Sequence, residues 1–71
     1  MNDIARLKSL GSAIAILRKT NGMSQVDLAL KAKVSKSFLS DLERGVRNPS
    51  YLTLCKIADA LGVPVSAFFL G

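Results

Sequence analysis

Histidine is absent from this 71-residue sequence, cysteine occurs once, and aspartate and glutamate together number five. A single cysteine cannot form a disulfide within the chain, which is consistent with a reducing cytoplasm, and we expect Cys55 to be a small buried apolar residue. Without histidine, and with acids that stand singly, the sequence offers no zinc site, no nucleophile paired with a base and no glycine-rich phosphate loop. These absences argue against an enzyme, a bound metal and any other cofactor.

Long hydrophobic runs are also missing. No apolar segment is long enough to span a bilayer, and polar and charged residues interrupt the apolar patch from Ala13 to Leu17, so the start of the chain makes a poor signal peptide. Repeated helix caps and glycines argue against the one long basic amphipathic helix that a membrane-surface peptide needs. We therefore expect a cytoplasmic protein with no membrane partner, in which residues 13–17 belong to the core.

Positive charge is what the sequence has in excess. Ten lysines and arginines against five acids give a formal net charge of +5 and an isoelectric point near 9.9. A basic balance favours a polyanionic partner such as nucleic acid. Many small soluble domains are basic, so the partner has to be identified from the pattern of residues.

Helical periodicity recurs along the chain, and capping residues divide it into five segments. Apolar residues of the first segment recur at spacings of three and four. Serines 24, 35 and 50 are predicted N-caps, and glycines 22, 45 and 62 are predicted stop signals. No segment alternates like a strand. The sequence therefore predicts an all-α, compact five-helix bundle in a single domain (1–71), with helices at about residues 4–20, 24–32, 35–44, 50–61 and 65–70.

The second and third predicted helices, about residues 24–44, are short and almost contiguous. Ala29 is small where two helices cross closely, and Val34 in the turn can insert into the core. This pattern predicts a helix-turn-helix, whose second helix enters the major groove of DNA. A groove about 12 Å wide favours a slim outer face, and the outer face here carries short or flexible residues that can bond base edges: Ser35, Lys36, Ser37, Ser40 and Asp41.

Three stretches carry a family resemblance: "MSQVDLALKA", "SFLSDLERGVRNPS" and "LCKIADALGVPVSAFF". On these the chain resembles the phage repressor/Cro-like helix-turn-helix family, also called the xenobiotic response element family, over about residues 7–69. The resemblance implies a lambda-repressor-like fold and a sequence-specific regulator of transcription. It implies a homodimer that represses by binding an inverted-repeat operator in double-stranded DNA, with no small-molecule ligand.

The resemblance also implies roles for individual residues. Bases would be read by Lys36 and Ser37, with Ser40 and Asp41 further along the groove. Arg18 and Glu43 would form an internal ion pair, so Glu43 is structural. The expected phosphate contacts are Gln25, Ser35, Arg44, Arg47 and Asn48.

Several roles stay open at this point. Lys33 stands where the family often has glycine, so either it adopts an unusual backbone angle or the turn differs, and it can add a phosphate contact. Asp41 repels phosphate but can accept a hydrogen bond from cytosine N4. Phe38 can pack in the core or touch a thymine methyl.

A dimer interface is predicted at the C-terminal end, because the apolar residues there are not easily buried in the core. A two-fold dimer would read two half-sites about 34 Å apart. Its expected residues are Val65, Phe69 and Leu70. A phage regulator, a restriction–modification controller and a small chromosomal regulator all fit, and repression and activation stay open. The rival interpretation is a protein-binding adaptor or antitoxin-like module of the same fold, in which DNA binding is secondary.

Overall fold

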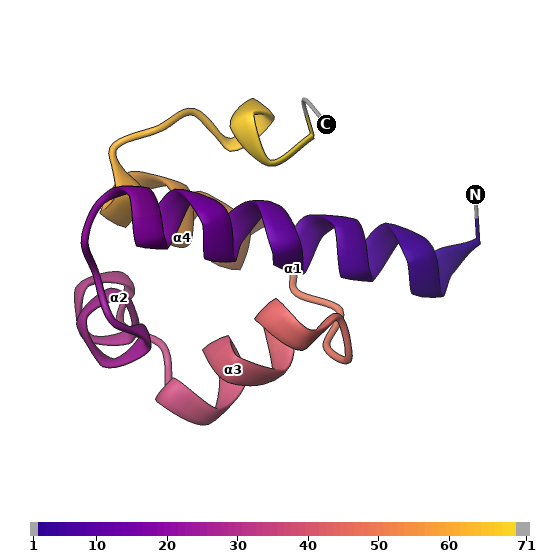
Figure 1. Cartoon of the computed structure of the whole chain (residues 1–71), viewed down its shortest axis with the longest axis horizontal. Coiled ribbons are helices and arrows are strands. Elements are labelled where there is room, and N and C mark those ends of the chain that lie inside the picture. The colour runs from indigo at the N-terminus through magenta and orange to yellow at the C-terminus, as the bar shows by residue number, and fades with distance from the viewer. Residues whose placement is uncertain (1, 70–71) are drawn as a thin grey trace.

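The computed structural model describes residues 2–69, and these form helices and turns without a strand. The order is α1 (Asp3–Thr20), α2 (Gln25–Ala32), α3 (Lys36–Arg44), α4 (Tyr51–Leu61) and the 3₁₀ helix η1 (Val65–Phe69). In Figure 1, α1 runs across the molecule as its longest rod, with α2 and α3 on one side and η1 on the other. The all-α prediction is confirmed.

The prediction of five α-helices was wrong in its last member. The segment Val65–Phe69 winds as a 3₁₀ helix, and the Ala67 N–H donates to the Pro64 carbonyl three residues back at 3.0 Å. A segment of five residues is short enough for this tighter winding, which proteins use in short pieces. The described residues therefore hold four α-helices and one 3₁₀ helix.

Local capping chemistry sets where the α-helices begin. The predicted caps Ser24, Ser35 and Ser50 each accept a hydrogen bond from a backbone N–H three residues later. Ser24 and Asp27 form a reciprocal capping box, with both bonds at 3.0 Å. The cap of α1 is Asn2, which the sequence analysis did not identify. Each cap satisfies a donor that the helix itself leaves free.

The turn between α2 and α3 depends on a strained lysine. Lys33 lies in the left-handed region, with φ 60° and ψ 42°, and it is the one residue other than glycine with positive φ among those described. The Val34 N–H then donates back to the Ala29 carbonyl at 3.0 Å, and Val34 packs against the core. The unusual backbone angle, one of two alternatives expected from the sequence, is therefore the one adopted.

The core is built from side chains of all four α-helices and of η1, which contributes Phe68. Its fully buried large side chains are Ile14, Leu28, Leu39, Leu42 and Ile57. The expectation that residues 13–17 are all core was wrong at Ile16, which is 63% exposed because it lies two residues from Ile14 and so on another face of the helix. No helix within residues 2–69 combines the length and apolarity needed to cross a membrane.

A glycine allows α1 to approach α3 closely. A Cβ atom built at Gly11 would lie 2.6 Å from the Glu43 carbonyl oxygen, and it would also crowd the Leu42 carbonyl. Real Cβ atoms do not approach a backbone oxygen so closely. The absence of a side chain at Gly11 therefore sets the distance between the two helices at the point where the α3 C-terminus is held.

Candidate nucleic-acid interface

The helix α3 lies along the edge of the molecule opposite η1 (Figure 1), and it has a buried and an exposed side. Its inward residues Leu39 and Leu42 are fully buried. Lys36 and Ser37, in its first turn, are exposed, while Ser40 and Asp41 in its second turn are half-buried. The four residues predicted to read bases therefore lie outside the core and follow one another along this helix.

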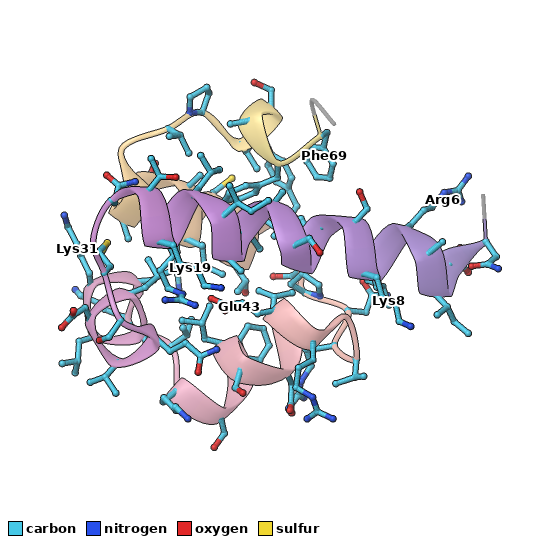
Figure 2. The ribbon with its side chains drawn as sticks, viewed as in Figure 1. Arg6, Lys8, Lys19, Lys31, Glu43 and Phe69 are labelled. Carbon is cyan, nitrogen blue, oxygen red and sulfur yellow. The ribbon has the colours of Figure 1, made fainter. Side chains whose placement is uncertain are left out.

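The inner side of α3 is held by an ion pair between Arg18 and Glu43. Arg18 Nε donates to Glu43 Oε2 at 2.7 Å and Arg18 Nη2 donates to Oε1 at 2.9 Å, while Nη1 donates to the Met23 carbonyl at 2.8 Å. The two side chains are only 10% and 7% exposed. In Figure 2, Glu43 extends from α3 into the space beside α1. This double contact ties the end of α1 to the end of α3.

The protonation states of this pair follow from its surroundings. Burial alone would raise the pKa of Glu43, but hydrogen bonds from Arg18 and Gln25 and the charges of Arg18 and Lys19 outweigh it, so the pKa lies below its ordinary value. The hydrogen bond to Glu43 raises the pKa of Arg18 against the opposing effect of burial. Both groups are therefore charged at neutral pH, as a structural ion pair requires.

Gln25, a predicted phosphate contact, is also connected to this pair. Its Nε2 atom donates to Glu43 Oε1 at 3.0 Å, and the side chain is half-buried at the start of α2. A glutamine amide carries two N–H donors, so one is left for a phosphate. The contact links the first residue of α2 to the last turn of α3 and so braces the helix-turn-helix.

The outer side of α3 carries a looser group, which we call the arginine cluster: Phe38, Asp41, Arg44 and Arg47. Asp41 Oδ1 lies 3.4 Å from Arg44 Nη1, and Asp41 Oδ2 lies 3.5 Å from Arg47 Nη2. The Arg47 guanidinium also lies over the Phe38 ring, 5.2 Å from its centroid. The structure thus brings a predicted base reader together with two predicted phosphate contacts.

Phe38 and Ser35 each have a structural role that is now visible. Phe38 is half-buried against the core and at the same time supports Arg47 by a cation–π contact. The Ser35 hydroxyl accepts a hydrogen bond from the Phe38 N–H at 3.0 Å. Its own hydrogen remains a donor that a phosphate can accept.

The N-terminal half of α1 adds positive charge that was not predicted from the sequence. A Cβ at Gly45 would lie 2.7 Å from Lys8 Cγ, so the stem of Lys8 passes directly over the glycine that ends α3. In Figure 2, Lys8 points toward the side of α1 that carries α3. Asn48, exposed in the following loop, lines a shallow hollow with Asp3 and Arg6 of α1. Only the close crossing of α1 over the loop brings these residues together, so no local sequence signal placed Lys8 and Arg6 beside Asn48.

The predicted dimer residues lie away from α3. Phe69 is 62% exposed at the end of η1, on the opposite side of α1 from α3 (Figure 2), and Val65 is half-buried. Phe68, the neighbour of Phe69, is buried and meets it edge to face, with ring centroids 6.5 Å apart. Leu70 lies outside the described residues. Within residues 2–69 no three histidine, cysteine, aspartate or glutamate side chains are grouped so that they could hold a metal ion.

Comparison with known proteins gives consistent matches. The helix-turn-helix family matches residues 14–68. The immunity repressor protein of Bacillus phage phi105 is 48% identical over 59 residues, which cover 83% of this chain and 41% of the repressor. The chain therefore spans less than half the length of that relative.

Two solved structures share the fold over nearly their whole length. The restriction–modification controller protein C.AhdI of Aeromonas hydrophila superposes with a TM-score of 0.90 at 34% identity, covering 92% of this chain and 98% of the controller. The controller C.Esp1396I, seen as a tetramer in complex with its natural 35 base-pair operator, superposes with a TM-score of 0.82 at 33% identity. That match covers 90% of this chain and 84% of the controller.

Proposed function

Because this chain belongs to the helix-turn-helix family, as its resemblance indicated, we propose that it is a sequence-specific DNA-binding regulator of transcription, acting as a repressor. One observation carries the proposal. The first turn of α3 presents Lys36 and Ser37 free of the core, while Arg18 and Glu43 hold the other side of the helix in place. A rigid helix with a slim polar outer face is what the major groove accepts.

In the proposed complex, α3 lies in the major groove with its N-terminal turn at the base edges. Lys36 donates to guanine O6 or N7, and the Ser37 and Ser40 hydroxyls donate or accept. Asp41 accepts from an exocyclic amino group. The phosphates on either side bind Gln25, Ser35, Arg44, Arg47 and Asn48, which fixes the register without reading sequence.

We propose that the active form is a homodimer on an inverted-repeat operator, with residues 1–71 folding as one domain. Phe69 supports this, because its large apolar side chain is 62% exposed at the end of η1, where a second copy of the chain would cover it. The operator-bound C.Esp1396I tetramer is a precedent for assembly on DNA in this fold. Double-stranded DNA as the partner places the proposed activity at the nucleoid in the cytoplasm. The proposal includes no catalytic step.

The test is a selection from random duplex DNA at near-physiological salt, with sequencing of the bound pool. A two-fold symmetric motif with half-site centres about 34 Å apart would support both the operator and the dimer. Binding that enriches no motif, and that is lost steeply as salt rises, would leave only charge attraction and contradict the proposal. Sedimentation of Phe69→Asp beside the unaltered chain tests the dimer separately.

A protein-binding adaptor remains the second candidate, and it draws on a different surface. Val26 and Leu30 lie one turn apart on α2 and are both exposed. Residues four apart share a helix face, so these two side chains form a small apolar strip beside the reading helix. An adaptor predicts that Leu30→Lys abolishes function in cells while the selected DNA motif is unchanged.

A further inference from the structure

We propose that Asp41 couples base reading to phosphate binding, because its carboxylate holds Arg44 and Arg47 in the free protein and releases them when an exocyclic amino group of a base takes their place. The inference rests on the proposed DNA-binding function. It makes Asp41 a specificity-determining residue whose main effect is on DNA of the wrong sequence.

Both oxygens of the carboxylate are engaged in the free protein. Oδ1 faces Arg44 and Oδ2 faces Arg47, at 3.4 and 3.5 Å. These distances are long for charge-assisted hydrogen bonds, and both arginine side chains are about half exposed or more, at 69% and 49%. Exposed pairs of this kind are weak, so a phosphate or a base can displace them.

The position of Asp41 on α3 places it between the two kinds of contact. Ser37 lies four residues before it and Arg44 three residues after it, so all three share one helix face. Ser37 belongs to the turn proposed to read bases, and Arg44 belongs to the end proposed to hold phosphate. A negative charge at this point faces DNA whichever sequence is bound.

Arg47 is held on this face by a second contact. It comes from the loop after α3, and the Phe38 ring lies 5.2 Å beneath its guanidinium. Phe38 packs against the core, so its position does not depend on Asp41. When the ion pair between Asp41 and Arg47 breaks, Arg47 therefore stays over α3 and is available to a phosphate.

Two states of the cluster follow from this geometry. On a sequence with no amino group opposite Asp41, the carboxylate keeps its two arginines from the nearby phosphates, so binding is weak. On a sequence with cytosine at that position, N4 donates to the carboxylate and the two arginines turn to phosphates. The correct base thus gains its own hydrogen bond together with two phosphate contacts.

The experiment compares Asp41→Ala with the unaltered chain and with Asp59→Ala, which makes the same change of charge and size at an exposed position of α4. The random-duplex selection is repeated for each, and binding to the selected operator and to a scrambled duplex is titrated over a range of salt. Urea unfolding of each variant, and Asp41→Asn as a second replacement, show that the fold is intact.

We expect Asp41→Ala to bind the scrambled duplex about twofold to thirtyfold more tightly, the range for freeing two exposed ion pairs. The salt dependence should steepen by up to about 2, one phosphate contact for each arginine. The cytosine preference at one position of each half-site should disappear, while Asp59→Ala should retain it. Adding Arg44→Ala and Arg47→Ala to Asp41→Ala should remove the gain on scrambled DNA.

Two results would overturn the coupling. If Asp41→Ala raises affinity for operator and scrambled duplex by the same factor, Asp41 is only a repelling charge. If both affinities fall, Asp41 positions the arginines and does not compete for them. If the unaltered chain selects no motif at all, the DNA-binding proposal fails first, and the inference fails with it.

Discussion

The inner and outer sides of α3 each pair arginine with a carboxylate, and the two contacts differ in distance, burial and bonding. On the inner side, Arg18 and Glu43 share two hydrogen bonds of 2.7 and 2.9 Å almost out of reach of water. On the outer side, Asp41 faces two arginines at 3.4 and 3.5 Å in solvent. A buried pair fixes one geometry and is costly to break from one side, whereas exposed pairs exchange partners easily.

The two sides of α3 therefore have different roles. The inner contact ties α3 to α1 and α2, so the direction of the reading face is set before DNA arrives. The outer contact leaves charged groups that can change partner when DNA arrives. Changes on the inner side should therefore alter stability, and changes on the outer side should alter binding.

Among the changes that test this difference, Glu43→Ala should have the largest effect on stability. It leaves the Arg18 guanidinium buried without its carboxylate and should lower the free energy of unfolding by about 3–5 kcal/mol. The matched change on the outer side, Asp41→Ala, should cost less than about 1 kcal/mol. Urea denaturation followed by circular dichroism measures both. Equal losses would show that the two contacts do not differ as described.

Acid should weaken the inner contact selectively. The pKa of Glu43 in the folded protein lies below its ordinary value of 4.5, so its contribution to stability is complete above pH 4.5 and is lost as the pH falls through the lower, folded value. Glu43→Gln should flatten the fall in stability over that window. Unfolding measured from neutral to acid pH tests this, and a variant as acid-sensitive as the unaltered chain would exclude Glu43 as a main cause.

Asp27 supplies a second acid-sensitive contribution that should survive in Glu43→Gln. The hydrogen bond from the Ser24 backbone, followed by that from the Ser24 side chain, lowers the pKa of Asp27. The sign is the same as for Glu43, so a decline in stability with acid should remain in the variant.

Lys36→Ala tests the base-reading turn on the outer side. It should relax base preference at one position of each half-site, at a cost of about 1–3 kcal/mol in discrimination, because lysine donates to guanine there. Lys56→Ala, which removes the same charge from an exposed position of α4, serves as the control. Competition binding with single-base operator variants gives the measurement. An unchanged preference would remove Lys36 from the base readers.

Arg47→Ala should remove one phosphate contact. Binding of the operator should weaken, and its slope of log K against log salt should fall by about 0.9. Binding of the scrambled duplex, on which Asp41 holds Arg47, should change less. Lys56→Ala again controls for loss of charge. If the salt slope stays the same, Arg47 makes no phosphate contact, and the proposed role of the arginine cluster in phosphate binding is wrong.

Local chemistry explains which parts of this fold could be predicted. Serine caps and glycine stops act within one helical turn, so the starts of α2, α3 and α4 follow from the sequence. The helix-turn-helix itself spans about twenty residues with a characteristic pattern, and its resemblance to known regulators was confirmed. The winding of Val65–Phe69 was not predicted, because apolar residues over five positions fit an α-helix and a 3₁₀ helix equally.

The contacts that were not predicted join residues far apart or in loops. Gly11 against Glu43, Lys8 over Gly45 and Arg47 over Phe38 each depend on how two elements cross. No periodicity records such a crossing. Each site residue was predicted separately from the sequence. The structure adds that Asp41 forms ion pairs with two of the others, Arg44 and Arg47.

A change at Lys33 should have the smallest effect on stability. Lys33 bears on both sides of α3, because the turn it occupies sets the angle between α2 and α3. The left-handed conformation costs a residue with a Cβ about 1–2 kcal/mol, which glycine avoids. Glycine also makes the unfolded chain more flexible, which offsets about 0.5–1 kcal/mol of this gain in stability. Lys33→Gly should therefore stabilise the fold by about 0.5–1 kcal/mol.

Lys33→Ala separates strain from charge at this turn, because it keeps the left-handed strain and removes the ammonium group. If Lys33 binds phosphate, both variants should lower the salt slope by about 0.9, while only Lys33→Gly should raise the urea midpoint. A lysine at this turn would then be a phosphate contact held at the expense of stability. If both variants bind DNA as the unaltered chain does, the strained backbone at Lys33 contributes nothing to binding. The first residue of the DNA-binding surface in this segment is then Ser35.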